Sequence, residues 1–284
     1  MLADCHVHTS FSDDSPYPME DVAADALRLN LDAICFTDHV DYGVKPDAHS
    51  PEAEHARLDP HLGKPITNVD YEAYFPEVHR EQQLFDGQLQ IACGLEFGIQ
   101  RHTVPQFERV LDRWGDQLDF VLLSIHQVDD QEFWTGEFQE GRTQGEIRRR
   151  YYEEMLAVME AFDGYDSLAH LDLIRRYDPY GERDFAEDRD LVAPVLEKVI
   201  ANGKAVELNT SSWRYGLADL QPSTPLLELY RDLGGRLITL GSDSHLPQHL
   251  GSYLRVAQRR LRELGFREFV TYEHHVPTPH PLAF

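Results

Sequence analysis

Two histidines separated by one residue, His6 and His8, end a short apolar stretch at the N-terminus, "MLADCHVH". Side chains two positions apart on a β-strand point to the same face, with their backbone positions roughly 7 Å apart. The two imidazoles could therefore bind one metal ion. A single pair of this kind is about as often hydrogen-bonded in a protein core, so the rest of the sequence has to decide.

Residue types that bind metals recur after most of the other apolar stretches. They are Asp14, His39 in "FTDH", Glu96 in "CGLE", His126 in "SIH", His170 in "LAH", and Asp243 and His245 in "GSDSH". Clustering so many ionisable groups without a cation would cost free energy through desolvation and mutual repulsion. A metal ion removes this cost, because it prefers neutral imidazole and ionised carboxylate. We therefore predict that His6 and His8 are metal ligands.

Alternating strands and helices are predicted to position these side chains. The predicted strands are 2–8, 32–38, 89–96, 119–126, 165–170, 204–209 and 236–242, and the predicted helices are 18–29, 71–86, 103–113, 143–162, 189–202, 225–233 and 254–264. This alternation predicts βαβ units and a parallel sheet. The number of repeats alone favours a barrel, in which all strands end at one face and build the active site there.

Nine candidate ligands exceed what one four-coordinate ion can take. Two or three divalent ions are therefore expected, and the mixture of nitrogen and oxygen ligands without thiolate suits Zn, Mn or Fe. Glu96, as the acid among the middle strands, is the expected bridging carboxylate. The surplus positive charge of such a site would attract a small dianion, and a phosphate ester fits.

Composition excludes several classes of protein. The chain has 284 residues, 42% of them hydrophobic, and a net charge of −24, which repels nucleic-acid backbones and anionic lipids. No apolar run is long enough for a membrane span, and the N-terminus lacks the pattern of a secretory signal. A cytoplasmic protein is expected, with Cys5, Cys35 and Cys93 as buried, reduced thiols.

Two segments interrupt the alternation. Residues 40–70 show no clear period, and a loop of that length is usually functional or mobile. Its acids Asp41, Asp47 and Glu52 could attract a cationic amine, although such a run is usually a solvated face. The C-terminal tail is predicted as a short strand followed by an end broken by prolines, with surface histidines.

Six motifs occur in the order found in one known superfamily: "HVHTSFSDD", "FTDH", "GLEFG", "SIH", "HLDLIRRY" and "GSDSH". Over nearly its full length the chain resembles the histidinol-phosphatase branch of the PHP (polymerase and histidinol phosphatase) superfamily. The resemblance implies a distorted (β/α)7 TIM-like barrel of the PHP type, formed by residues 1–284 as a single domain. It also implies a trinuclear metal site.

The resemblance further implies three ligand sets. The first is His6, His8, Glu96 and Asp243, the second is Glu96, His126 and His170, and the third is Asp14, His39 and His245. Some members have histidine in place of Asp14, so the third set of this chain is richer in oxygen. The occupancy of the third set and the metal that fills it therefore stay open.

The implied reaction is hydrolysis of L-histidinol phosphate to L-histidinol and phosphate, a step of histidine biosynthesis. Water activated by the ions would attack phosphorus in line, with charge stabilised by the ions and an arginine. Arg176 best matches the branch's pattern, Arg214 could reach the same phosphate, and Arg175 could simply point outward. The catalytic residues are then Glu96, Asp243, His245 and Arg176, with the proton donor left open between Asp243 and His245.

Three alternatives remain. The first is a phosphoesterase of the same superfamily that acts on another small phosphate. The second is the nuclease role of PHP domains attached to polymerases, which the negative charge disfavours. The third is a non-catalytic metal-binding module, which the full set of nine ligand types disfavours. The expected partner is a small phosphorylated substrate, and the sequence leaves the oligomeric state open.

Overall fold

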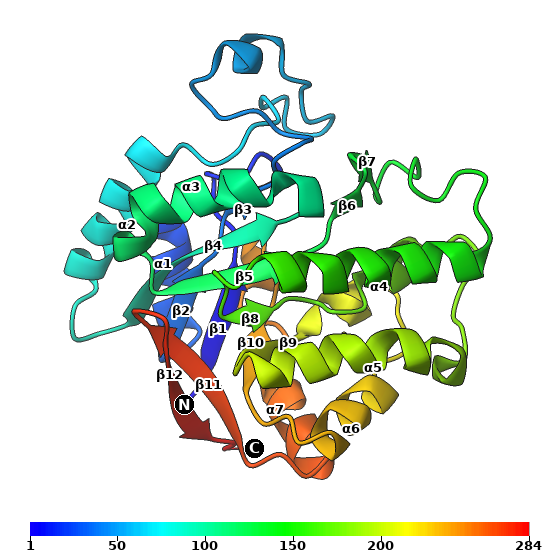
Figure 1. Cartoon of the computed structure of the whole chain (residues 1–284). Coiled ribbons are helices and arrows are strands. Elements are labelled where there is room, and N and C mark those ends of the chain that lie inside the picture. The colour runs from blue at the N-terminus through cyan, green and yellow to red at the C-terminus, as the bar shows by residue number, and fades with distance from the viewer. Residues whose placement is uncertain (284) are drawn as a thin grey trace.

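The computed structural model describes residues 1–283 as strands and helices in alternation (Figure 1). The strands are β1 (Ala3–Val7), β2 (Ala33–Phe36), β3 (His39–Val40), β4 (Gln90–Gly98), β5 (Phe120–Ser124), β6 (Gln127–Val128), β7 (Gln131–Glu132), β8 (Ser167–Leu168), β9 (Ala205–Asn209), β10 (Ile238–Gly241), β11 (Glu268–Glu273) and β12 (Val276–Pro281). The helices are α1 (Met19–Arg28), α2 (Tyr71–Leu84), α3 (Val104–Trp114), α4 (Gln144–Ala161), α5 (Phe185–Ala201), α6 (Thr224–Asp232) and α7 (Leu254–Glu263). Each range predicted from the sequence overlaps one of these elements.

Seven parallel strands form a nearly closed barrel, in the order β1, β2, β4, β5, β8, β9 and β10. The predicted (β/α)7 barrel is therefore confirmed. It is distorted in two places, because the register of β1 against β2 shifts between Asp4 and Val7, and because β8 is only two residues long. All seven strands end toward one rim, which brings their last residues close together.

The seam between β1 and β10 is closed by a backbone bridge and by one buried side chain. A bridge between Val7 and Ser244 joins the two strand ends, with His8 N donating to Ser244 O at 2.8 Å. Below it, the buried Asp4 carboxylate accepts hydrogen bonds from the backbone N–H and the hydroxyl of Ser242 at 2.8 and 2.6 Å. The seam is thus tied at the level of the first predicted ligand pair.

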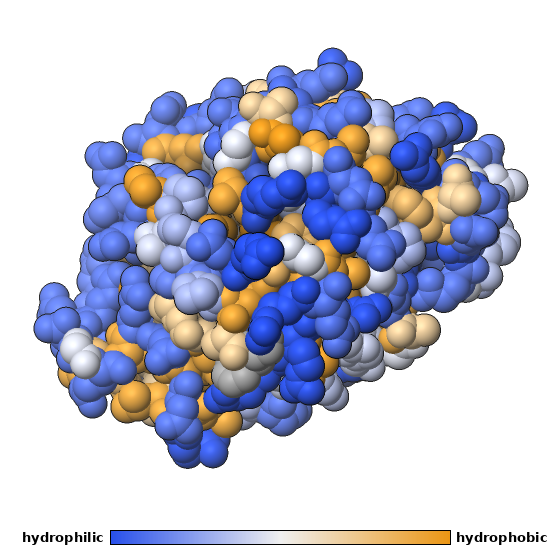
Figure 2. Space-filling view, turned by 90° about the horizontal axis from the view of Figure 1, so that it is seen from below, coloured by the Kyte–Doolittle hydropathy of each residue, from blue (hydrophilic) through white to orange (hydrophobic). Residues whose placement is uncertain are grey.

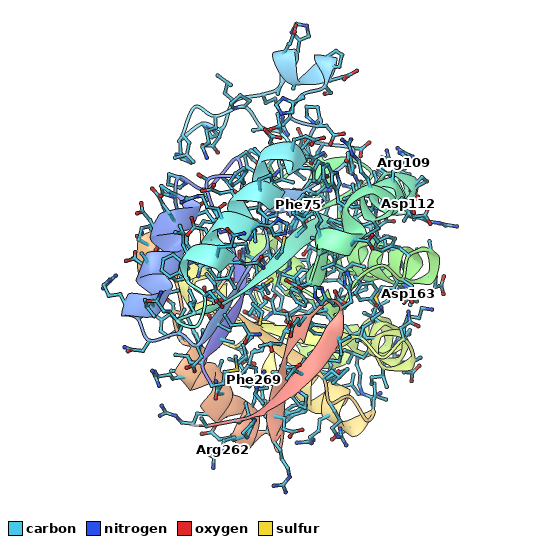
Figure 3. All side chains as sticks on the ribbon, turned by 90° about the vertical axis from the view of Figure 1, so that its left-hand side faces the viewer. Phe75, Arg109, Asp112, Asp163, Arg262 and Phe269 are labelled. Carbon is cyan, nitrogen blue, oxygen red and sulfur yellow. The ribbon has the colours of Figure 1, made fainter. Side chains whose placement is uncertain are left out.

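Helices cover the barrel and present one apolar face to it. On α2, Phe75 is buried and stacks on Trp114 of α3, and the neighbouring Tyr74 hydroxyl donates to Gly94 O of β4 at 2.7 Å. On α3, Phe107 is buried while Arg109 and Asp112 are exposed at the outer surface (Figure 3). The helices therefore hold the strands in place and leave the barrel's C-terminal rim for the site.

The C-terminal tail is more ordered than the sequence predicts. β11 and β12 form an antiparallel hairpin in which Tyr272 pairs with Pro277 and Val270 with Pro279. Alternate residues of a strand direct their N–H groups to opposite edges. Prolines at every second position therefore remove N–H groups only from the outer edge, and the hydrogen bonds to the partner strand remain. The predicted proline-broken end is therefore wrong, and the prolines mark an edge strand instead.

The hairpin packs under the barrel, at the end opposite the predicted site (Figure 1). Tyr272 stacks near Phe120, with ring centroids 5.1 Å apart, and its hydroxyl donates to Asp166 O at 3.2 Å. Hydrophilic residues cover most of the surface at this end, and smaller hydrophobic areas show between them (Figure 2). The hairpin thus closes the barrel's N-terminal end.

The hairpin turn consists of His274 and His275, both with positive φ, 48° and 63°. His275 Nδ1 lies 2.8 Å from Asp166 Oδ2, and His274 Nδ1 lies 3.3 Å from Asp119 Oδ1. The hydrogen bond to Asp166 raises the pKa of His275 above its ordinary value, although partial burial opposes the shift. These histidines lie at the surface and away from the site, as the sequence predicts.

We predict that His275→Asn destabilises the protein more at low than at high pH. A raised folded-state pKa means that the contribution of His275 is fully present below its unfolded pKa of about 6.5 and is lost as pH rises through the folded pKa. Urea unfolding at about pH 5.5 and about pH 9 measures the difference. His79→Gln, at an exposed position of α2, is the control. An equal loss for His275→Asn at both pH values would contradict the prediction.

Residues 40–70 project from the C-terminal end of the barrel (Figure 1). They contain a short 3₁₀ helix, Pro51–His55, and a bridge between Leu58 and Pro65. Lys64 Nζ donates to the carbonyl oxygens of Ser10, Ser12 and Ser15, at 3.0, 3.2 and 2.7 Å. The segment is therefore attached to the turn that follows β1.

Candidate metal centre

The structure brings the nine predicted ligands together at the C-terminal rim. Each comes from the end of a barrel strand or the turn after it: His6, His8, Asp14, His39, Glu96, His126, His170, Asp243 and His245. Four groups of three side chains, drawn mostly from these residues, place their nitrogen and oxygen atoms within 4.8 Å of one another. The rim therefore contains donor sets of the size that metal ions need.

Glu96 occupies the centre of the cluster. Its Oε1 lies 2.8 Å from His170 Nε2 and 3.2 Å from His126 Nε2. Its Oε2 lies 3.3 Å from His6 Nε2 and 3.4 Å from His8 Nε2. The two oxygens thus face two different groups of imidazoles, which is the geometry expected of a bridging carboxylate.

A third group lies toward the solvent. His245 Nε2 is 3.3 Å from His39 Nε2 and 3.3 Å from Asp14 Oδ2, as the third predicted set requires. His8 also belongs to a group with His39 and His245, and its ring stacks on that of His245 at a centroid distance of 3.9 Å. His8 therefore lies between the first and third predicted sets.

Two carboxylates that the sequence analysis did not assign to the site hold the histidines from outside. Glu207 Oε1 lies 2.7 Å from His6 Nδ1, and Asp41 Oδ1 lies 2.7 Å from His126 Nδ1. Each carboxylate fixes a proton on Nδ1, so that the Nε2 lone pair faces Glu96. This is the outer arrangement that orients metal-binding imidazoles in proteins.

Two glycines make room for these carboxylates. A Cβ atom at Gly98 would lie 1.8 Å from Asp41 Oδ1, and one at Gly241 would lie 2.1 Å from Glu207 Oε1. Any side chain at either position would displace the carboxylate from its histidine. The sequence signal was present in "GLEFG" and "TLGSDSH", but the glycine partners are visible only in three dimensions.

The inner carboxylates stay ionised. Burial raises the pKa of Glu96, but the imidazoles of His6 and His126 outweigh it and hold that pKa well below its ordinary value. Burial likewise raises the pKa of Asp243, and His6, His245 and nearby arginines outweigh it in the same direction. The rim thus gathers ionised carboxylates and imidazole side chains, the ligand types that divalent cations prefer.

Buried polar atoms without hydrogen-bond partners also indicate that the cluster binds cations. Among residues 1–283, His170 Nδ1 is buried without a hydrogen bond, and so are His39 Nδ1 and Glu96 Oε2, although these two lie 2.9 Å apart. Leaving buried polar atoms unpaired is costly, so these residues fit bound cations.

The two predicted phosphate arginines line the same cavity, which has a volume of about 510 Å³. Arg176 donates to Ser211 Oγ at 2.6 Å and stacks 3.8 Å over the Tyr215 ring, while its Nε is buried without a partner. Arg214 donates to the carbonyl oxygens of Ser242 and Asp243. Both guanidinium groups are thus fixed beside the candidate ligands.

Arg175 is held elsewhere, since it donates to Asp172 Oδ2 at 2.8 Å and to the Glu182 carboxylate at 3.0 Å. It belongs to a smaller, separate cavity and is not part of the lining of the large one. The sequence-based distinction between the two adjacent arginines therefore matches the geometry.

Among the acids of residues 40–70, the expectation of a solvated face is wrong for Asp41. Its carboxylate is buried and bound between His126 and Lys45, with Lys45 Nζ at 3.0 Å. Asp47 accepts from Asn68, Glu52 is exposed, and neither lines the cavity. A cationic substrate group would therefore need a different carboxylate.

We predict that Asp41→Asn lowers zinc affinity by about 10- to 100-fold, because loss of a carboxylate behind a metal-binding histidine typically costs that much. A competition titration with a chromogenic chelator measures the change. Asp47→Asn, in the same segment but away from the cavity, is the control. Unchanged affinity in Asp41→Asn would show that the contact with His126 is only structural.

Comparisons with known proteins agree with this geometry. The PHP domain model matches residues 4–211. The histidinol-phosphatase of Lactococcus lactis is 30% identical over 275 residues, covering 95% of this chain and 93% of that protein. A probable histidinol-phosphatase of Thermotoga maritima is 29% identical, covering 93% of each chain.

A solved structure shares the whole fold. The crystal structure of the Lactococcus lactis histidinol phosphate phosphatase, complexed with zinc, L-histidinol and phosphate, superposes with a TM-score of 0.82 at 29% identity and covers 98% of both chains. A putative histidinol phosphatase of Listeria monocytogenes, at 19% identity and a TM-score of 0.70, covers 88% of this chain and shares the fold.

Proposed function

The chain belongs to the PHP domain family, and on that premise we propose that it hydrolyses L-histidinol phosphate to L-histidinol and inorganic phosphate. The observation that carries the proposal is the match along 98% of the chain to a structure that binds zinc, L-histidinol and phosphate. The cavity beside the candidate ligands supports it, because its volume of about 510 Å³ admits a small phosphate ester.

Among the described residues, no helix is both long and apolar enough to cross a bilayer.

We propose that the nine clustered residues hold two or three divalent ions, of Zn, Mn or Fe. The inward Nε2 atoms and ionised carboxylates support the three ligand sets implied by the family, with Glu96 shared between two of them. When bound, such ions supply Lewis-acid activation of the phosphoryl group and of the attacking water. Glu96, Asp243 and His245 then contribute to catalysis by holding these ions in place.

The chain's own cations orient the phosphoryl group. The unpartnered Nε of Arg176 is a donor available to a phosphate oxygen, and stacking on Tyr215 fixes the plane of the guanidinium. Arg214 is held by the carbonyl oxygens of Ser242 and Asp243, which directly follow β10, so its charge stays at the rim. Both residues are placed to stabilise charge on the phosphoryl oxygens as the ester bond breaks.

The candidates for proton transfer to the leaving alcohol lie next to one another. His245 Nδ1 is 3.5 Å from Asp243 Oδ1, and both residues line the cavity. We propose that this pair orients the water or substrate group from which the alkoxide takes its proton.

We also propose that residues 1–284 act as a single catalytic domain, located in the cytoplasm.

We predict that Glu96→Gln and Asp243→Asn each abolish phosphate release from L-histidinol phosphate while the protein remains folded. Each change removes one ionised oxygen from the donor sets, so metal analysis should also show fewer bound ions than in the wild type. Circular dichroism checks the fold, and Glu137→Gln, at an exposed position, is the control. Near-normal turnover in both variants would refute the metal-centre assignment.

Chelation should stop the wild-type reaction, and added Zn or Mn should restore it.

We predict that Arg176→Lys lowers kcat/KM for the same ester by about 10²- to 10³-fold, because lysine keeps the charge but loses the planar pair of donors. Arg175→Lys, next in the chain but bound away from the cavity, should stay within about threefold of the wild type. Equal losses in the two variants would mean that Arg176 acts through folding rather than on phosphate.

A further inference from the structure

Glu132 lies beside the candidate metal centre on the short β6–β7 hairpin. This hairpin follows His126 directly, and Glu132 pairs across it with Gln127. Phe133 N then donates to His126 O at 3.2 Å, so the chain returns to the same level of the rim. The Glu132 side chain is 8% exposed and lines the large cavity.

The other carboxylates that line the cavity are already engaged. Asp13 and Asp41 bind Lys45, while Glu96, Asp14 and Asp243 face the imidazole cluster. Asp59 caps the backbone N–H groups of His61 and Leu62, at 2.9 and 2.6 Å. Glu132 differs from these carboxylates in its partner, which is the half-exposed side chain of Arg57.

The present partner of Glu132 is a residue that can move away. Among residues 1–283, its carboxylate has one side-chain partner, Arg57, whose Nη2 lies 2.6 Å from Oε2. The Arg57 side chain is 52% exposed and belongs to the projecting segment 40–70. A buried carboxylate that meets a half-exposed cation at a cavity wall is suited to exchange that cation for one from a ligand.

Aromatic side chains flank this carboxylate. Phe133 and Trp134 follow Glu132 directly and also line the cavity, and Trp134 is 53% exposed at its mouth. A carboxylate next to aromatic faces is a favourable environment for an organic cation. The cavity therefore has two poles, a phosphate pole at the metal centre and the two arginines, and a cation pole at Glu132.

We propose that Glu132 determines specificity by binding the cationic nitrogen of the alcohol part of the ester, so that the cavity selects phosphates of amino alcohols. The inference rests on the proposed phosphatase function and adds the residue that recognises the substrate. Glu132 and the candidate metal ligands line one cavity, as a substrate with a phosphate at one end and a cation at the other requires. Arg57 occupies the position when the cavity holds no cation.

The test compares Glu132→Gln with the wild type on three esters: L-histidinol phosphate, O-phosphoethanolamine and p-nitrophenyl phosphate, which lacks a cation. We expect KM for the two cationic esters to rise about tenfold or more, as for loss of a charged hydrogen bond. Values of kcat, and both constants for p-nitrophenyl phosphate, should change less than about twofold. Equal changes on all three esters, or none, would overturn the proposal.

Two further variants separate recognition from structure. Arg57→Gln removes the competing cation and should leave KM for the cationic esters unchanged or lower. If it raises KM as much as Glu132→Gln does, Glu132 acts by holding segment 40–70, and the proposal is wrong. Asp59→Asn should behave as the wild type, and a selective rise of KM there alone would also overturn it.

The proposed function can fail separately. If the wild type hydrolyses O-phosphoethanolamine in preference to p-nitrophenyl phosphate and Glu132→Gln loses that preference, the inference stands even when L-histidinol phosphate is not a substrate. If L-histidinol phosphate is hydrolysed but the preference for cationic esters survives Glu132→Gln, the function stands and the inference fails.

Discussion

The structure depends on one electrostatic constraint, the gathering of imidazole lone pairs and ionised carboxylates at a buried rim. Glu96 faces His6, His126 and His170 at contact distance, and none of these four side chains reaches bulk water freely. The cluster is held from outside by Glu207 and Asp41 behind His6 and His126, and Ser124 Oγ donates to Glu96 Oε1. The depth of the barrel, the outer acids and the glycines beside them all serve to keep this arrangement in place.

The fold and the inner site could be predicted largely because parallel strands end together. His126 and His170 each follow an apolar run, and the barrel converts that position in the sequence into proximity in space. The choice of Arg176 over Arg175 came from the family resemblance, and the large cavity is lined by Arg176 and not by Arg175. Local pattern was sufficient here, since each residue's place follows from its own strand.

The outer carboxylates could not be predicted in the same way. Asp41 lies in a segment without periodicity, and its contact depends on the missing side chain of Gly98 in another strand. Glu207 lies inside β9 and resembles an ordinary strand residue in the sequence. Its role comes from its contact with His6 of β1, which only the three-dimensional structure shows. The hairpin of β11 and β12 was missed for a related reason, since prolines break a strand only when they fall on its paired edge.

The candidate ligands on the two sides of the β1–β10 seam come from opposite ends of the barrel sequence and are therefore synthesised at different times. His6 and His8 stand on one side of it, and Asp243 and His245 stand on the other, so a cation between them would staple the first barrel strand to the last. A nascent chain holds the first pair long before the second has been made. The donor set across the seam is therefore complete only after β10 and the turn that follows it have been synthesised.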